Sequence, residues 1–262
     1  EWDEAFSFYK QGADAICQVA NYNINDDINI INSVIRQASP EWLNQYQDVK
    51  PIDKQPIFIV GLPRTGSTLC ERIISSHSNV TSLGETLFIQ MLLKQYSKIN
   101  SPERMSSEII EALTDVNIED MAEQYIECVR YRLGKEYYFI DKLPINVLYL
   151  GFIVKAFPNA KIVYLNRHPM DACFASFKQL FADAYLHSYD QEEMARHHVR
   201  YRRLMAHWRR EFPGRIINVS YEDTARDVEP HARSLIEALG LDWEDACLDF
   251  HTSSQGVATA SA

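Results

Sequence analysis

An apolar run followed at once by a glycine-bounded turn is the segment that most constrains the fold of this chain. Residues 57–60, Ile-Phe-Ile-Val, are β-branched or aromatic, which is typical of a buried strand. Gly61 and Gly66 then enclose four residues, and Ser67 and Thr68 open a stretch with helical spacing of apolar residues. The segment therefore predicts a strand, a tight loop and a helix start, an arrangement whose backbone amides can bind a phosphate.

The loop has the glycine spacing of a nucleotide-binding P-loop, G-x-x-x-x-G-K-[ST], but it lacks the lysine of that motif. Ser67 stands at the lysine position, and Arg64 supplies a basic residue inside the loop instead. Enzymes that handle a nucleoside triphosphate use this lysine on the β- and γ-phosphates. The loop therefore indicates a ligand with a single phosphate at this position rather than a triphosphate.

Strand and helix patterns alternate after the loop. The predicted strands cover residues 57–61, 137–140, 161–165 and 216–219, with a short fifth strand near Val80. The predicted helices cover residues 68–76, 118–134, 145–157, 169–180, 191–212 and 230–239. This alternation predicts an α/β fold: a three-layer, P-loop-like domain with a central parallel sheet flanked by helices.

Polar side chains directly follow several of the expected strands. The loop follows Gly61, Lys142 comes at the end of a second strand, and Arg167 follows a third. The carboxyl ends of parallel strands meet at one edge of a sheet, where α/β proteins bind their ligands. These segments therefore predict one shared cleft.

Two amphipathic segments precede the α/β region. Apolar residues recur at helical spacing over residues 2–20 and 27–35, and prolines between Pro40 and Pro56 mark a linker. We expect a short helical N-terminal segment over residues 1–50 and an α/β domain over residues 51–262. The pattern stops at Ala262, so the C-terminal part of this domain is expected to be incomplete.

Composition restricts the partners and the compartment. The 262 residues include 26 Lys and Arg against 36 Asp and Glu, and the net charge of −10 disfavours nucleic acid as a partner. Five scattered cysteines without a C-x-x-C pair indicate reduced thiols and a cytoplasmic location. Spanning a bilayer takes about 18 apolar residues, and no run of that length is present. The chain starts at Glu1 rather than Met, so an upstream targeting segment stays open.

The loop also carries a family resemblance. Residues 63–68, Pro-Arg-Thr-Gly-Ser-Thr, resemble the 5′-phosphosulfate loop of sulfotransferases that use 3′-phosphoadenosine 5′-phosphosulfate (PAPS). Further segments follow in the order of that family: Gly84-Glu85-Thr86, Asp141-Lys142-Leu143-Pro144, Arg167-His168-Pro169 and Tyr221-Glu222-Asp223. The pattern is most similar to tyrosylprotein sulfotransferases and to bacterial sulfotransferases linked to tetratricopeptide (TPR) repeats. Residues 1–20 then resemble the end of a TPR array.

The resemblance implies a catalytic role for three residues. Glu85 would act as the base that deprotonates an acceptor hydroxyl, and Lys142 would stabilise the oxygen that leaves sulfur. Arg64 would hold the 5′-phosphate. Taken alone, Glu85 also fits an ordinary solvated loop residue and Lys142 an ordinary surface lysine, and His77 is a rival base.

The resemblance also implies the cofactor and its ligands. PAPS would be bound and 3′,5′-ADP (PAP) released, with no metal required, because a transferring sulfuryl group carries less negative charge than a phosphoryl group. The implied cofactor-binding residues are Arg64, Thr65, Gly66, Ser67, Thr68, Arg167, Ser176, Tyr221 and Ser261. The family usually has a serine at the position that Ala175 occupies here. Either Ser176 replaces that contact with the 3′-phosphate, or the contact is lost.

Histidines also allow a zinc interpretation of the sequence. His77, His197 and His198 are the candidate ligands, but no acidic residue or cysteine recurs near them at ligand spacing. The sequence therefore predicts no metal site.

Three functions are compared on this basis. The favoured function is transfer of a sulfuryl group from PAPS to the hydroxyl of a protein tyrosine, a saccharide or a small molecule. The alternatives are a P-loop kinase that phosphorylates a small molecule with ATP, and a non-catalytic nucleotide-binding module. The expected partner is an acceptor peptide, protein or small hydroxyl compound, and a homodimer is compatible with the sequence.

Overall fold

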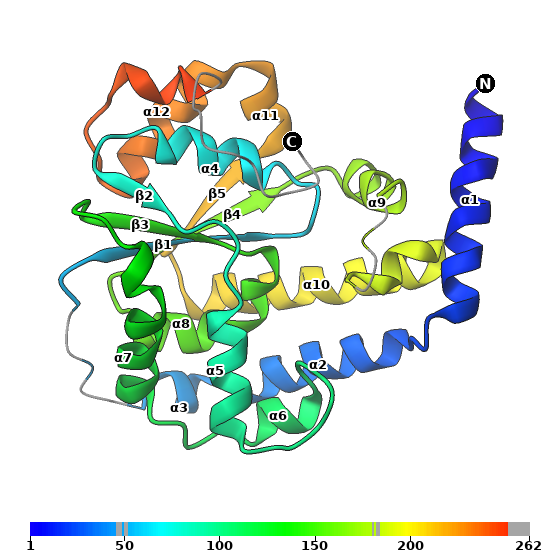
Figure 1. Cartoon of the computed structure of the whole chain (residues 1–262), viewed down its shortest axis with the longest axis horizontal. Helices are drawn as coiled ribbons and strands as arrows, with labels where there is room; N and C mark the ends of the chain where they lie inside the picture. Colours follow the sequence, from blue (N-terminus) through cyan, green and yellow to red (C-terminus); the bar gives the residue numbers. More distant parts are fainter. Residues whose placement is uncertain (46–48, 50–51, 180, 182–183, 251–262) are drawn as a thin grey trace.

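A five-stranded parallel sheet forms the centre of the computed structural model, which describes residues 1–45, 49, 52–179, 181 and 184–250 (Figure 1). The strand order is β2-β3-β1-β4-β5. The strands are β1 (Gln55–Gly61), β2 (Val80–Ser82), β3 (Tyr138–Lys142), β4 (Lys161–Asn166) and β5 (Ile216–Ser220). The predicted α/β fold and all five predicted strands are confirmed.

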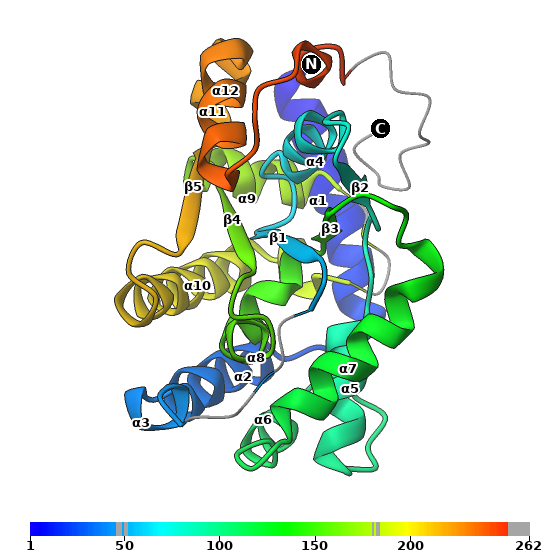
Figure 2. The ribbon, with the colours of Figure 1, turned by 90° about the vertical axis from the view of Figure 1, so that its left-hand side faces the viewer.

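Helices form a layer on each side of the sheet, as Figure 2 shows after a quarter turn. One layer contains α4 (Ser67–Ser75), α11 (Tyr221–Arg226) and α12 (Val228–Leu239). The other contains α2 (Ile24–Gln37), α3 (Pro40–Leu43), α5 (Phe88–Ser97), α6 (Ser107–Glu111), α7 (Ile118–Val129), α8 (Leu150–Ala156) and α10 (Gln191–Glu211). None of the described helices combines the length and apolar character that crossing a bilayer requires.

Successive side chains of β1 enter two different apolar cores. Ile57 and Ile59 are buried with residues of α4 and α12, whereas Phe58 and Val60 are buried with residues of α7 and α8. A parallel strand covered on both faces reads as a continuous apolar run, because neither face can carry polar residues. This double burial is the physical reason why residues 57–60 were recognisable as a strand.

The sequence missed four helices, of which α5 is the longest. Both ends of α5 lack the usual signals. Leu87 precedes α5 without a capping hydrogen bond from its side chain, and Lys98 ends it in the left-handed conformation that glycine usually fills. The predicted helix at 145–157 is in fact a 3₁₀ segment, η2 (Pro144–Tyr149), followed by α8.

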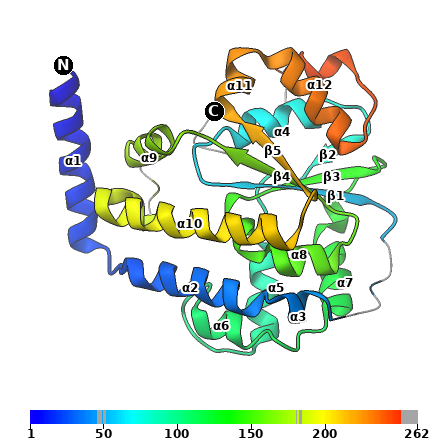
Figure 3. The same ribbon diagram turned by 180° about the vertical axis from the view of Figure 1, so that it is seen from behind.

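The two N-terminal helices pack differently from each other. Helix α2 lies against α10 and α6, and it buries Ile31 and Val34 in the core on that side of the sheet. Helix α1 (Trp2–Val19) stands at one end of the molecule, beside α9 (Pro169–Phe177) and the 3₁₀ segment η3 (Leu186–Tyr189) (Figure 3). The predicted domain boundary at Pro51 lies outside the described residues, and the TPR resemblance of residues 1–20 stays a prediction.

The strand order brings the predicted functional segments to one edge of the sheet. Strand β1 pairs on one side with β3 and on the other with β4. The functional positions therefore follow one another along the carboxyl edge as Glu85 after β2, Lys142 on β3, the loop after β1, Arg167 after β4 and Tyr221 after β5. The sheet thus assembles in space what is spread over more than half of the sequence.

Candidate active site

The phosphate loop is held by its own backbone and by one buried hydroxyl. Gly66 is the N-cap residue of α4 and has a φ of 93°, and Arg64 also has a positive φ, 63°. The Thr65 hydroxyl donates a hydrogen bond of 2.7 Å to the Leu62 carbonyl, and Thr65 is buried. Because this hydroxyl is used inside the loop, the predicted cofactor contact of Thr65 can come only from its backbone. Ser67 and Thr68 form the first turn of α4, where backbone amides and the helix dipole favour an anion.

Arg167 and Tyr221 lie against the loop from the β4–β5 side. Arg167 Nη1 donates a hydrogen bond of 2.7 Å to the Arg64 carbonyl, and its guanidinium lies over the Tyr221 ring, 4.3 Å from the centroid. The same ring packs on Gly66 so closely that a Cβ there would lie 2.5 Å from Tyr221 Cδ2. Arg167 Nε is buried and has no hydrogen-bond partner within the described part of the chain. The predicted nucleotide-side residues are therefore brought together, with an unsatisfied donor among them.

Lys142 lies on the other side of the loop, between two carboxylates. Its side chain is 1% exposed, and its Nζ lies 2.6 Å from Glu85 Oε1 and 3.5 Å from Glu71 Oε2. The Glu85 side chain is 44% exposed, so it also faces solvent. An ammonium buried to this extent needs opposite charge beside it. The structure thus brings together the predicted base and the predicted lysine, which sequence reasoning had placed at separate strand ends.

Glu71 is a site residue that sequence reasoning missed. It lies on α4 four residues after Ser67, and its carboxylate also accepts a 2.6 Å hydrogen bond from the Ser82 hydroxyl. Residues four apart share one helix face. This spacing from the loop was the available signal, but nothing in the sequence showed that Lys142 would come to meet that face.

The neighbouring residue on β3, Asp141, points to the opposite side of the strand and is completely buried. Its carboxylate accepts hydrogen bonds from Thr86 Oγ1 (2.6 Å), Tyr125 OH (2.8 Å) and Asn146 Nδ2 (3.2 Å). Thr86 directly follows Glu85, so Asp141 fixes the segment that carries the predicted base. Asp141 is therefore a positioning residue.

Tyr185 is a second missed neighbour of the site. It has a φ of 51°, an uncommon conformation for an aromatic residue. Burial and the nearby Glu85 carboxylate raise the pKa of its hydroxyl. Tyr185 precedes η3, whose residues the sequence had not assigned to any element, so no local pattern connected it with Glu85.

His77, the rival base, is turned away from the cleft. Its Nε2 lies 2.9 Å from the Asp242 carbonyl, and its Nδ1 accepts a 3.1 Å hydrogen bond from the Asn79 amide. His77 precedes β2, whereas Glu85 follows it, so the two residues belong to opposite ends of that strand. The alternative assignment of the base to His77 is therefore wrong in this geometry.

Two predicted cofactor ligands, Ser176 and Ser261, are not brought into these contacts by any described residue. Ser176 is buried on α9 and lines a small cavity with Leu62 and Pro63, and neither Arg167 nor Tyr221 borders this cavity. Ser261 lies outside the described residues. The cofactor contacts of both serines stay predictions.

The family model of the sulfotransferase family matches residues 56–245, well over half of the chain. The chain belongs to the sulfotransferase family. The match begins at β1 and includes every described residue of the loop, the Glu85–Lys142 pair and the Arg167–Tyr221 stack.

Relatives in sequence include proteins named for tyrosine sulfation. An uncharacterized protein of Aquifex aeolicus is 29% identical over 269 residues, covering 100% of this chain and 35% of the relative. Protein-tyrosine sulfotransferase 1 of Danio rerio is 24% identical over 208 residues, covering 75% of this chain and 56% of the relative. The chain thus spans about a third of the first relative and just over half of the second.

Solved structures support the fold. The sulfotransferase domain of the Synechococcus PCC 7002 olefin synthase superposes with a TM-score of 0.55 at 23% identity, covering 80% of this chain and 82% of that domain. The sulfotransferase domain from the curacin biosynthetic pathway gives a TM-score of 0.54 at 17% identity, with 78% and 80% covered. At these identities the likeness concerns the fold of the chain alone.

The contact between Gly66 and Tyr221 predicts a specific cost for a side chain at position 66. Gly66→Ala places an alanine at a φ of 93° and drives its Cβ into the Tyr221 ring. The left-handed backbone costs about 1–2 kcal/mol and the overpacking about 1–3 kcal/mol of unfolding free energy. Urea unfolding measures the sum.

Gly240→Ala is the matched control for this variant, because Gly240 has a φ of 81° with nothing near its Cβ position. Gly240→Ala should lower the unfolding free energy only by the cost of placing an alanine in a left-handed backbone conformation. Equal losses in both variants would show that the Tyr221 ring is not seated on the loop.

Asp141 predicts a pH dependence of stability for this chain. Burial raises the pKa of its carboxyl to about 6, against hydrogen bonds that lower it. The folded chain therefore keeps this proton between about pH 4 and pH 6, where the unfolded chain has released it. The stability that this proton contributes is fully present below the pKa that Asp141 has in the unfolded chain. It is lost as the pH rises through about 6, the pKa of Asp141 in the folded chain.

The variant Asp141→Asn cannot titrate at this position. Relative to Asp141→Asn, wild type should lose of order 2 kcal/mol of unfolding free energy between pH 4 and pH 7. Parallel urea titrations at each pH measure the difference, and a difference that does not change with pH would contradict the assignment.

Proposed function

We propose that this chain transfers a sulfuryl group from PAPS to an acceptor hydroxyl. The observation that carries the proposal is the Glu85–Lys142 pair beside a phosphate loop in which Ser67 replaces the P-loop lysine. A half-exposed carboxylate can accept a proton from a hydroxyl, and an adjacent buried ammonium can stabilise charge that develops on an oxygen. Acid–base and electrostatic groups for one transfer are thus a single hydrogen bond apart.

The residues around the loop fit the adenosine bisphosphate part of PAPS. The N-terminus of α4 and the residues from Arg64 to Thr68 suit the 5′-phosphate. Arg167 suits the 3′-phosphate, because its buried Nε has no hydrogen-bond partner within the described residues and a guanidinium matches phosphate oxygens. The Tyr221 ring, already stacked under Arg167, offers an apolar face to the nucleoside.

The proposed reaction gives each residue one task. PAPS supplies the sulfuryl group, whose bond to the 5′-phosphate oxygen breaks as the acceptor oxygen bonds to sulfur. Glu85 accepts the proton of the acceptor hydroxyl and so loses its negative charge. Lys142 is then released from part of its pairing and donates to the oxygen of the departing phosphate. Glu71 stays 3.5 Å from Lys142 Nζ and keeps the ammonium in place during this exchange.

The kinase alternative finds less support in the same residues. Within the five described strands, Asp141 is the acidic residue that a magnesium-dependent enzyme could use in the manner of a Walker-B aspartate. Its carboxylate is enclosed by Thr86, Tyr125 and Asn146 on the far side of β3. A non-catalytic nucleotide-binding module would not need the Glu85–Lys142 pair.

A peptide tyrosine is the acceptor we propose to test first. The relatives from Danio rerio and Drosophila melanogaster are named protein-tyrosine sulfotransferases, and each aligns with about three quarters of this chain. Transfer of radiolabel from PAPS to tyrosine peptides, saccharides and small phenols would identify the acceptor class. Transfer to a saccharide or a small phenol alone would reject the peptide.

The nucleotide site is tested by binding of PAP without magnesium. Isothermal titration calorimetry should give saturable binding to the wild-type chain. Arg167→Ala should weaken it by about 10- to 100-fold, the effect of losing one charge-assisted contact. Arg226→Ala removes an exposed arginine that pairs with Asp223, and it serves as the control with unchanged affinity.

The three candidate functions separate in this titration. Equal PAP affinity in the Arg167→Ala and Arg226→Ala variants would overturn the assignment of Arg167. Binding of ATP that depends on magnesium would favour the kinase. Binding of PAP without transfer from PAPS to any acceptor would favour the non-catalytic module.

The base is tested by Glu85→Gln. This variant should bind PAP with near wild-type affinity, while its turnover with PAPS should fall by about 100-fold or more, because the glutamine cannot accept the proton. Glu71→Gln is the matched control: it also removes a carboxylate from Lys142 and should reduce turnover much less. Equal rate losses would mean that neutralising Lys142, not general base catalysis, is the task of Glu85.

A further inference from the structure

A cluster of metal-ligating side chains lies outside the proposed transfer site. Asp27 on α2, His187 on η3 and His197 on α10 each place a ligand atom within 4.8 Å of the others. His187 Nδ1 lies 3.4 Å from Asp27 Oδ2, and the two imidazole rings are stacked 3.7 Å apart. Two imidazoles and a carboxylate are a common zinc ligand set.

His187 is the buried member of this cluster, and Asp27 and His197 are half-buried. His187 is 6% exposed, and its Nδ1 has no partner of hydrogen-bond geometry within the described residues. A buried nitrogen without a partner is unusual and needs an explanation.

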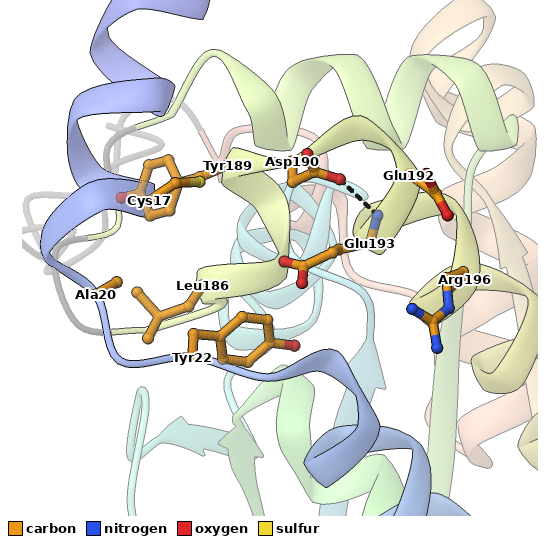
Figure 4. Close-up of a pocket in the computed structure, with 9 residues that line it drawn as sticks. All are labelled: Cys17, Ala20, Tyr22, Leu186, Tyr189, Asp190, Glu192, Glu193 and Arg196. Carbon is orange, nitrogen blue, oxygen red and sulfur yellow. Dashed lines mark hydrogen bonds between the residues drawn. The ribbon is translucent and has the colours of Figure 1, made fainter.

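A cavity near the cluster is lined by three carboxylates and by Arg196 (Figure 4). Tyr22, Asp190, Glu192 and Glu193 are among its lining residues. Tyr22 connects the two features, because its hydroxyl donates a 2.7 Å hydrogen bond to Asp27 Oδ2. Glu193 lies one helical turn before His197 and therefore shares its face of α10. Tyr22 thus borders the cavity with its ring and contacts a proposed ligand with its hydroxyl.

We propose that Asp27, His187 and His197 bind one divalent transition-metal ion, for which zinc is the best match. The three ligands come from three elements, so the ion would tie α2 and α10 to η3. Tyr185, beside Glu85, lies two residues before His187, and the ion would therefore also fix the chain next to the transfer site. The site differs from the sequence prediction of no metal because Asp27 and His187 are 160 residues apart in sequence.

Binding requires a small rearrangement of the side chains. Zinc lies about 2.0–2.1 Å from imidazole nitrogens and carboxylate oxygens, so the three donors must close in on the ion. Nitrogen lone pairs lie in the ring plane, and the planes of His187 and His197 are only 8° apart. One ring must therefore tilt before both lone pairs point at one ion, which side-chain rotation permits. Water would complete four-coordination.

Zinc titration of the whole chain tests the proposal directly. After treatment with a chelator, the chain should bind one equivalent of Zn²⁺ in calorimetry, and the ion should raise the melting temperature. Asp27→Asn and His197→Ala should each weaken this binding by at least about 10-fold. His198→Ala is the matched control, because it removes the adjacent imidazole on α10, which is outside the cluster.

Cobalt binding shows whether any of the five cysteines, rather than the proposed residues, binds the ion. Co²⁺ in the proposed site should show visible d–d bands without the near-ultraviolet band of a thiolate ligand, and the d–d bands should vanish in His197→Ala. Circular dichroism in the presence of chelator checks that each variant is folded. If His197→Ala does not fold, Asp27→Asn replaces it in the test, because this variant keeps the shape of the side chain. No saturable Zn²⁺ binding, or binding equal in wild type, Asp27→Asn and His198→Ala, would overturn the proposal. These readouts do not depend on sulfuryl transfer, so the site and the proposed function can fail separately.

Discussion

A lysine ammonium buried at the end of β3 needs negative charge around it, and this requirement arranges the site. Lys142 obtains that charge from Glu85, in the loop after β2, and from Glu71, on the helix after β1. Three segments that start on different strands are therefore tied together at one point. In the proposed reaction, the cation from β3 takes the place of the lysine that a P-loop carries.

Adjacent residues of the same strand serve the two sides of the sheet. Lys142 faces the loop, while Asp141 points into the larger core and collects three hydrogen bonds from Thr86, Tyr125 and Asn146. The period-two geometry of a strand makes this division possible. Thr86, one of the donors to Asp141, directly follows Glu85 in the sequence. The buried Asp141 carboxylate therefore supports the position of Glu85 in the cleft.

Local patterns predicted those parts of the structure that depend on local constraints. The run at residues 57–60 is buried on both faces, so its sequence alone indicates a strand, and Gly66 is required by a backbone angle. Contacts between residues far apart in the chain have no such signal in the sequence. Glu71 contacts Lys142, and Asp27 contacts His187, only because distant elements pack together. The sequence identified Glu85 and Lys142 separately by resemblance, but not the hydrogen bond that joins them.

Gly66 is the N-cap residue of α4, and its missing side chain also leaves the space that the Tyr221 ring occupies. The space for a side chain at position 66 is therefore already taken by a residue 155 positions later in the chain. In the evolution of this family branch the two positions should be coupled. A homologue with a larger residue at the loop position would need a smaller residue at the start of α11, and the Arg167 guanidinium would then lose the ring on which it lies.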